Sequence, residues 1–208
     1  MKSVLVTGGT TRLGKVISDR LRTDGWRVIT VSHRADSGAD VIADFREGMG
    51  AARCFAAALK LLNGEPPTAL VNNAALFTGT DEELEAVGLT TPKKLTMMMA
   101  GRENGRGTVV NILDADRFRS GKYGEVKRAL REYTSAAAKM FVDTLRVNAV
   151  SPGPLLGLSP LAVREKAAFC PLGRPTPEAV ADAVSFLIGN DAVTGIDIPV
   201  SGGIELAE

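Results

Sequence analysis

Short apolar runs alternate along the chain with longer segments in which apolar residues recur at helical spacing. The first run, 3–7, ends in two glycines, and Leu13, Ile17 and Leu21 of the next segment share one helical face. The pattern predicts strands at 3–7, 27–32, 40–44, 68–74, 107–113, 146–150 and 195–200. It predicts helices at 12–24, 51–62, 121–142 and 177–188, with helical pieces over 82–104 that Gly88 and Pro92 interrupt.

This alternation of strands and helices predicts an α/β protein with a doubly wound parallel sheet, the Rossmann arrangement. No repeat or low-complexity stretch divides the 208 residues, so we expect a single domain over 1–208. In such sheets ligands bind outside the carboxyl ends of the strands. The residues that follow each strand are therefore the candidates for function.

Composition narrows the choice of ligand. The formal net charge is +1 and aromatic residues make up 5%, which disfavours a nucleic-acid or anionic-membrane partner. Two distant cysteines and a single histidine give no pattern of metal ligands. No apolar run reaches about 18 residues and no signal peptide is evident, so we expect a cytoplasmic protein that acts on a small molecule.

The glycine-rich turn TGGTTRLG, residues 7–14, joins the first strand to the first helix. Such a turn brings backbone N–H groups and a helix N-terminus against a phosphate, although a tight turn alone also needs glycine. It resembles the TGxxxGxG turn of the short-chain dehydrogenase/reductase family, with Arg12 in place of the middle glycine. Pteridine reductases of that family look like TGxxxRLG, and there the arginine serves the cofactor pyrophosphate and the bound pterin. The resemblance implies cofactor contacts by Gly8, Thr10, Arg12, Leu13 and Gly14.

Two further stretches resemble the cofactor site of this family. His33 and Arg34 follow the second strand, where an arginine would bind a 2′-phosphate and favour NADPH over NADH. The nearby Asp36 leaves some NADH binding open. Asp44, with Phe45 beside it, stands where the family's acid meets the adenine amino group; a helix N-cap is the other reading of Asp44.

The fourth strand runs into NNAALF, residues 72–77, which resembles the family's NNAG motif. The resemblance places Asn73, Ala74 and Ala75 alongside the cofactor. Pteridine reductases look like NNASSF here, and Phe77 matches the phenylalanine that stacks on the pterin. A core position is the alternative for Phe77.

Tyr123 and Lys127 lie one turn apart at the start of the helix 121–142. They match the YxxxK pair of the family, which implies that Tyr123 is the proton donor and that Lys127 holds the nicotinamide ribose. We expect the ammonium group of Lys127 to lower the pKa of Tyr123. The other tyrosine, Tyr133, is followed four residues later by Ala137 and is expected to lie in the core or an interface.

Asp114 follows the fifth strand, where the family usually has a serine that contacts the substrate carbonyl. Pteridine reductases look like VDA here, and this chain reads Leu113-Asp114-Ala115. An ionised carboxylate only accepts hydrogen bonds, so Asp114 suits an Asp–Tyr pair that protonates a ring nitrogen better than it suits carbonyl reduction. A turn cap is the alternative reading. The loop SPGPLL, residues 151–156, looks like the family's nicotinamide cover, with Pro152 and Gly153 at the cofactor and Pro154 at the substrate.

Together these features predict an NADPH-dependent reductase that transfers hydride to a C=N bond of a pterin or dihydrofolate-like substrate. Catalysis is assigned to Asp114, Tyr123 and Lys127, and substrate binding to Arg12, Phe77, Asp114, Tyr123 and Pro154. The alternatives are a ketone reductase of the same family and a non-catalytic NADP(H) sensor or scaffold. Shortened loops at 115–122 and 155–172, and Gly88 in place of the family's helix asparagine, keep the sensor or scaffold open. The resemblance implies a homodimer or homotetramer that packs through the small apolar residues of the long helix; a core position is the alternative for these residues.

Overall fold

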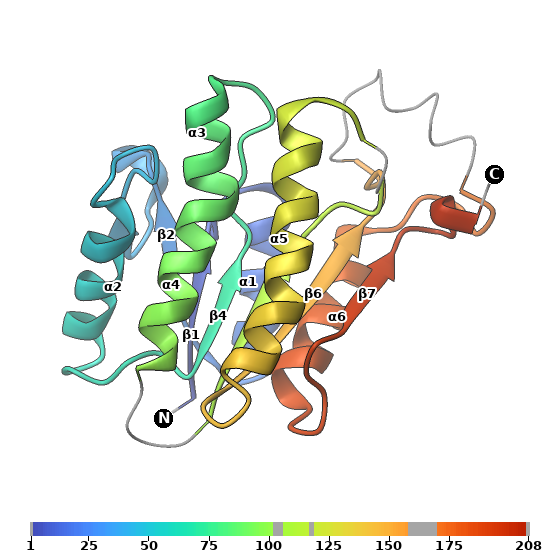
Figure 1. The fold of residues 1–208 in the computed structure, drawn as a ribbon. Helices are drawn as coiled ribbons and strands as arrows, with labels where there is room; N and C mark the ends of the chain where they lie inside the picture. Colours follow the sequence, from blue (N-terminus) through green and yellow to red (C-terminus); the bar gives the residue numbers. More distant parts are fainter. Residues whose placement is uncertain (1, 102–105, 117–118, 158–169, 207–208) are drawn as a thin grey trace.

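Seven parallel strands form one sheet in the order β3-β2-β1-β4-β5-β6-β7 (Figure 1). The computed structural model describes residues 2–101, 106–116, 119–157 and 170–206. The strands are β1 (Ser3–Thr7), β2 (Arg27–Ser32), β3 (Val41–Ile42), β4 (Ala69–Asn72), β5 (Gly107–Ile112), β6 (Leu145–Pro152) and β7 (Asp197–Val200). The order of the strands reverses between β1 and β4, which is where a doubly wound sheet binds its ligand.

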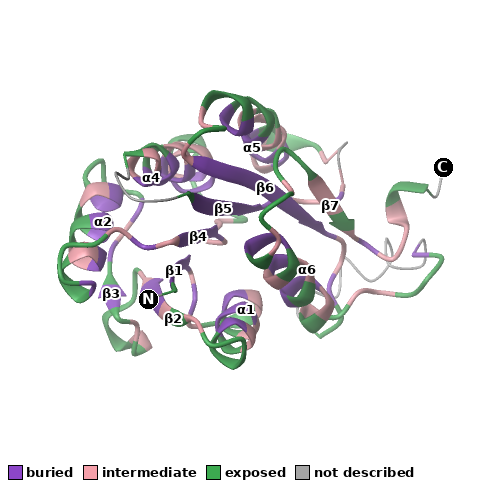
Figure 2. Cartoon of the chain, turned by 90° about the horizontal axis from the view of Figure 1, so that it is seen from below, coloured by how far each residue is buried: buried purple, intermediate pink, exposed green. Residues whose placement is uncertain are grey.

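Helices cover both faces of the sheet, so the predicted fold class is confirmed (Figure 2). The helices are α1 (Arg12–Thr23), α2 (Gly50–Leu61), α3 (Asp81–Glu85), α4 (Thr91–Ala100), α5 (Gly121–Met140) and α6 (Pro177–Gly189). The helices α2, α4 and α5 lie on one face of the sheet, and α1 and α6 lie on the other. Residues 158–169, within the expected substrate cap, lie outside the described residues.

Burial on both faces explains why the central strands are almost wholly apolar. Alternate side chains of a strand point to opposite faces. Leu5 of β1 packs into the core under α2, α4 and α5, whereas Val4 and Val6 pack into the core under α1 and α6. All five residues of β1 are buried, as expected for a parallel strand that is covered twice.

The segment 82–104 differs from its prediction, because Gly88 and Pro92 do not interrupt it. The π-helical segment η2 (Ala86–Thr90) links α3 to α4 without a break, and Pro92, the second residue of α4, follows directly after this wider turn. A Cβ atom on Gly88 would lie 2.5 Å from Cγ1 of Val126 on α5. The glycine therefore permits close packing of this segment against α5.

The outermost strand β7 pairs only with β6. The carbonyls of Ile196 and Val200 accept hydrogen bonds from the N–H groups of Ala149 and Gly153. Neighbouring residues of a strand face opposite sides, so the main-chain groups of Asp197 and Pro199 point away from β6. The strand predicted at 195–200 is therefore shorter in the structure. It tolerates Pro199 because the position of the missing N–H faces away from β6.

Candidate active site

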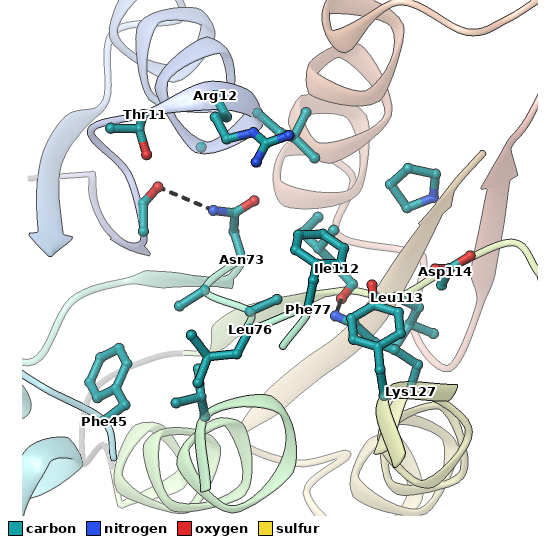
Figure 3. A pocket seen from close by; sticks show the side chains of 18 of the residues that line it. Thr11, Arg12, Phe45, Asn73, Leu76, Phe77, Ile112, Leu113, Asp114 and Lys127 are labelled. Carbon is teal, nitrogen blue, oxygen red and sulfur yellow. Dashed lines mark hydrogen bonds between the residues drawn. The ribbon is translucent and has the colours of Figure 1, made fainter. Parts of the chain in front are cut away.

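A cavity of about 730 Å3 opens at the carboxyl ends of the strands (Figure 3). Residues that line the cavity come from the turns after β1, β2, β3, β4 and β5, from the start of α5 and from the segment after β6. Every site residue expected from the sequence lines it. They are Gly8, Thr10, Arg12, Leu13, Gly14, His33, Arg34, Asp44, Phe45, Asn73, Ala74, Ala75, Phe77, Asp114, Tyr123, Lys127, Pro152, Gly153 and Pro154.

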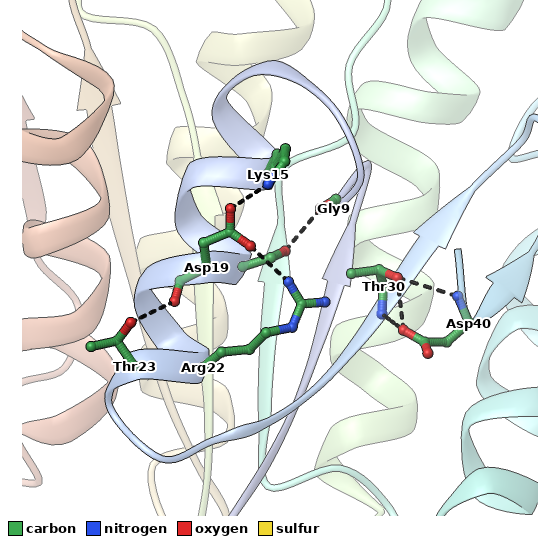
Figure 4. A network of polar contacts seen from close by, with 8 residues as sticks. Gly9, Lys15, Asp19, Arg22, Thr23, Thr30 and Asp40 are labelled. Atoms are coloured by element: carbon green, nitrogen blue, oxygen red, sulfur yellow. Dashed lines mark hydrogen bonds and ion pairs between the residues drawn. The ribbon is translucent and has the colours of Figure 1, made fainter. Parts of the chain in front are cut away.

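The glycine turn is compact because two of its glycines permit close backbone approach. Gly8 has a φ of 64°, and a Cβ atom on Gly14 would lie 2.0 Å from the carbonyl oxygen of Gly8. Asn73 fastens this turn to β4, because its Nδ2 donates to the carbonyl oxygens of Thr7 at 2.9 Å and Gly8 at 3.2 Å. The side chain of Ser18 on α1 donates to the carbonyl of Gly9 at 2.9 Å and holds the helix against the turn (Figure 4).

The N-terminus of α1 faces the cavity with no acidic residue in its first turn. Exposed N–H groups at that end favour an anion. Arg12, the first residue of α1, adopts a φ of 50°, a left-handed conformation that glycine would normally take. The compact turn, the helix end and Arg12 together fit a dinucleotide pyrophosphate.

Arg34 and Asp36 form an ion pair beside the cavity. The Nε and Nη2 atoms of Arg34 lie 3.1 and 2.9 Å from the two carboxylate oxygens of Asp36. This contact pairs Asp36, the acid that could have favoured NADH, with Arg34, and the Arg34 side chain remains exposed at the edge of the cavity. Asp40 fixes the base of the same connection, since its carboxylate accepts from the N–H and the hydroxyl of Thr30 (Figure 4).

Asp44 is held by an arginine that the sequence reasoning missed. The guanidinium of Arg46 forks onto its carboxylate, with Nη2 at 2.5 Å from Oδ2, and this contact lowers the pKa of Asp44 to about 2. Asp44 does not cap α2, because that helix begins at Gly50. The N-cap reading is therefore wrong, and Asp44 remains an ionised acceptor at the cavity wall.

Phe77 is an exposed aromatic residue and not part of the core. Its ring lies 5.1 Å from the ring of Tyr123, centroid to centroid, with the two planes 26° apart. The side chain is 59% exposed, and it lines the cavity. The two rings provide a flat apolar surface next to the expected proton donor.

Lys127 is buried one helical turn after Tyr123. Its Nζ donates to the carbonyl of Ile112 at 2.7 Å and lies 5.7 Å from the centroid of the Tyr123 ring (Figure 3). Burial lowers the pKa of Lys127 to about 8; the charge of Asp114 opposes this change, and that of Arg131 adds to it. Lys127 therefore titrates within the range in which enzymes are assayed.

The expected effect of Lys127 on Tyr123 is wrong for this structure. Burial raises the pKa of Tyr123 above its usual value, and the negative charge of Asp114 and a hydrogen bond to it raise it further. Only Arg119 opposes these effects. Tyr123 is thus a protonated phenol at neutral pH, as a proton donor must be before it reacts.

Arg119 is the second arginine that the sequence reasoning missed. Its Nη1 lies 3.0 Å from Oδ2 of Asp114, and its guanidinium carbon lies 4.8 Å from the centroid of the Tyr123 ring. Its backbone passes close to α5, because a Cβ atom on Gly124 would lie 1.9 Å from the Arg119 carbonyl oxygen. The same oxygen accepts a hydrogen bond from Nη1 of Arg128 at 2.8 Å. The short spacing between Asp114 and Tyr123 was the available signal, because a short connection keeps residues such as Asp116 and Arg119 next to the cavity.

Asp114 also accepts a hydrogen bond from the N–H of Asp116 at 2.9 Å, which closes the turn after β5. On the far side of the cavity, Gly153 approaches the last loop closely. A Cβ atom there would lie 2.8 Å from Cα of Ser201, and its N–H donates to Val200 at 3.0 Å. Arg174 holds the next residue, since its Nε donates to the carbonyl of Pro154 at 3.1 Å. These contacts fix both walls around Tyr123.

Comparisons with known proteins agree with this arrangement. Residues 91–205 match the family described as enoyl-(acyl carrier protein) reductase. The 3-oxoacyl-[acyl-carrier-protein] reductase MabA of Mycobacterium tuberculosis is 30% identical over 98% of this chain and 92% of its own length. Dehydrogenase/reductase SDR family member 4 of Bos taurus is 29% identical over 97% of this chain and 86% of its own length.

A solved structure adds a relative with a bound cofactor. The FolM alternative dihydrofolate reductase 1 of Brucella canis, complexed with NADP, superposes with a TM-score of 0.80 at 28% identity. The alignment covers 99% of this chain and 95% of FolM. Family match, relatives and fold agree, and the chain belongs to the short-chain dehydrogenase/reductase family of oxidoreductases.

Proposed function

We propose that this protein is an NADPH-dependent reductase that adds hydride to a C=N bond of a pterin or dihydrofolate-like ring. The observation that carries the proposal is the grouping of Asp114, Tyr123 and the exposed ring of Phe77 around one end of the cavity. A flat ring can stack on Phe77 while its nitrogen approaches the phenol of Tyr123. The likeness to FolM, named as a dihydrofolate reductase, supports this substrate class.

The residues along the cavity fit the parts of NADPH in order. The Gly8–Gly14 turn and Arg12 would hold the pyrophosphate, and His33 and Arg34 would hold the 2′-phosphate. Asp44 would accept from the adenine amino group beside Phe45. Asn73, Ala74 and Ala75 would line the cofactor, Lys127 would hold the ribose, and Pro152 and Gly153 would cover the nicotinamide. Bound NADPH supplies the hydride.

Tyr123 supplies the proton in this proposal. The hydride bonds to the ring carbon, the C=N π electrons move to nitrogen, and the Tyr123 hydroxyl proton passes to that nitrogen. The products are NADP+, a C–N single bond with its new N–H, and a phenolate that solvent reprotonates. The Asp114 carboxylate, paired with Arg119 at 3.0 Å, accepts hydrogen bonds, so its role is to orient the phenol and donor groups of the substrate.

A second candidate is a ketone reductase, which the 30% identity to a 3-oxoacyl-[acyl-carrier-protein] reductase favours. Asp114 weighs against it. A carboxylate beside a developing oxyanion repels it, where the family's serine would donate a hydrogen bond.

The test is oxidation of NADPH, followed by absorbance, with a dihydropterin, dihydrofolate and a panel of ketones. We expect turnover of the pterin or folate, and a loss of about 10²–10⁴-fold in kcat for Tyr123→Phe, because the variant lacks the proton donor. Tyr133→Phe is the matched control on the same helix, because Tyr133 does not line the cavity and packs against the core.

Each other outcome contradicts part of this proposal. Turnover of ketones alone would identify the second candidate. Tight NADPH binding without turnover of any substrate would identify a sensor or scaffold. Equal activity of wild type and Tyr123→Phe would remove Tyr123 from the reaction.

A further inference from the structure

A partly buried polar cluster lies behind the catalytic residues, and its hydrogen bonds have not been described above. It consists of Arg131 on α5, Ser151 on β6 and Asp197 on β7. Nε of Arg131 lies 2.9 Å from Oδ2 of Asp197, and the hydroxyl of Ser151 donates to Oδ1 of the same carboxylate at 2.7 Å. The side chains of Arg131 and Asp197 are only 19% and 17% exposed. A partly buried ion pair is screened less than an exposed one, so its charges act on their neighbours.

Arg131 connects this cluster to Asp114. Its Nη2 donates to the main-chain carbonyl of Asp114 at 2.7 Å and to the hydroxyl of Ser151 at 3.0 Å. The residue that carries the catalytic carboxylate is therefore held from behind by a guanidinium. A lysine could not make these three contacts at once, because they require the planar fork.

Arg131 also lies one helical turn after Lys127, on the same face of α5. Lys127 is buried and its Nζ donates to the carbonyl of Ile112. The charged and titratable groups around it are Tyr123 and Arg131 on α5, Asp114 and Arg119 from the segment after β5, and Asp197 behind Arg131. Arg131 is the cation among these that disfavours the ammonium form of Lys127.

We propose that Arg131 and Asp197 form a positioning pair for the catalytic residues, in which Asp197 orients the guanidinium of Arg131, and Arg131 holds the main chain of Asp114 and places its own charge one helical turn from Lys127. The assignment of Asp114 and Lys127 as catalytic rests on the proposed function. The positions and charges of Arg131 and Asp197 do not depend on the substrate. The pair can therefore be tested without any turnover.

The direct readout is the titration of Lys127, followed by NMR of its 13Cε signal and assigned through the loss of that signal in Lys127→Met. Arg131→Met removes a neighbouring positive charge, so we expect the pKa of Lys127 to rise by about one unit. Asp197→Asn removes the partner of Arg131, so we expect the pKa of Lys127 to fall. A role limited to folding predicts no such opposite shifts.

Two more variants separate charge from geometry. Arg131→Lys keeps the positive charge but loses the fork, so we expect titration of Lys127 close to wild type with kcat reduced roughly ten- to a hundredfold. Lys139→Met is the matched control, because Lys139 is also a cation of α5 but lies exposed in the last turn of that helix. We expect it to leave the Lys127 titration unchanged.

Shifts in the same direction for Arg131→Met and Asp197→Asn, or no shift in either, would overturn the proposed pair. Full activity of Arg131→Lys would overturn the anchoring of Asp114. If the wild type turns over no pterin, but the two variants still shift the pKa of Lys127 in opposite directions, the proposed function is contradicted and the pair is not.

Discussion

Arg12 combines a strained backbone with a functional side chain. Its φ of 50° is the conformation that the middle glycine of the family's turn would adopt without cost. A residue with a Cβ atom loses about 1–2 kcal/mol in this region. Such strain persists at functional positions when the side chain is needed, here a guanidinium at the phosphate end of the cavity.

This strain predicts an unusual order of stability at residue 12. Arg12→Gly should be more stable than Arg12→Ala by about 1 kcal/mol in urea unfolding, because only glycine relieves the left-handed conformation. Both variants should bind NADPH about tenfold more weakly, since each lacks the charged donor.

The same pair of substitutions at Arg22, a regular helical position of α1, is the control. There alanine should be the more stable by about 1 kcal/mol, since glycine is disfavoured inside helices. An alanine variant at residue 12 that matches the glycine variant would show that the backbone is not strained.

Among the elements, the continuous α3–η2–α4 segment depends on Gly88. A methyl group there would meet Cγ1 of Val126 at 2.5 Å, and a valine in a helix has little rotamer freedom to move away. We expect Gly88→Ala to destabilise the protein by about 1–3 kcal/mol in urea unfolding. The double variant with Val126→Ala should recover part of that loss.

Gly189→Ala is the matched control, a helical glycine with nothing within 4 Å of the added methyl group. It should be neutral or stabilising by up to about 1 kcal/mol. If Gly88→Ala behaves like Gly189→Ala, close packing is not the reason for the glycine.

The elements also show what the sequence could predict. Apolar periodicity identified every strand, and the rule that parallel strands end at one edge brought Gly8, Asp44, Asn73 and Asp114 to the same cavity. The continuity of the α3–η2–α4 segment was not predicted, because a glycine usually indicates a break in a helix, whereas Gly88 lies inside a π-helical turn. The predicted strands were wider than β3, β4 and β7, since propensity does not report where pairing stops.

Within the site, residue types were predictable but their pairings were not. Arg46, Arg119 and Arg131 each look like ordinary surface charges in the sequence. Their roles depend on distances across loops and between elements, such as the 2.7 Å from Arg131 to the Asp114 carbonyl. The raised pKa of Tyr123 has the same origin, because burial and the approach of Asp114 outweigh the opposing charge of Arg119.

For the whole molecule, the buried Lys127 predicts a pH-dependent stability. Its pKa is about 8 when folded and about 10.4 when unfolded, so between these values the unfolded chain binds the extra proton. The free energy of unfolding contributed by Lys127 therefore rises with pH across this window and is lowest below pH about 8. Wild type should gain about 2 kcal/mol relative to Lys127→Met between pH 8 and 10.

The comparison with Lys127→Met is necessary because Cys54 acts in the opposite direction. Burial raises the pKa of its thiol to about 12, so it lowers stability as pH rises above the unfolded value. Taking the difference between wild type and variant in urea unfolding removes this contribution. Lys139→Met, at an exposed lysine of the same helix, should show no change with pH. If the difference in unfolding free energy between wild type and Lys127→Met does not change with pH, burial does not lower the pKa of Lys127.

In the described part of the chain, no helix is both long and apolar enough to span a membrane. The described strands instead bear on how copies of the molecule can meet. At one border of the sheet β3 is only two residues long, and at the other Pro199 of β7 offers no N–H to an incoming strand. Both borders therefore resist growth of the sheet into a neighbouring copy, which protects a parallel sheet from aggregation.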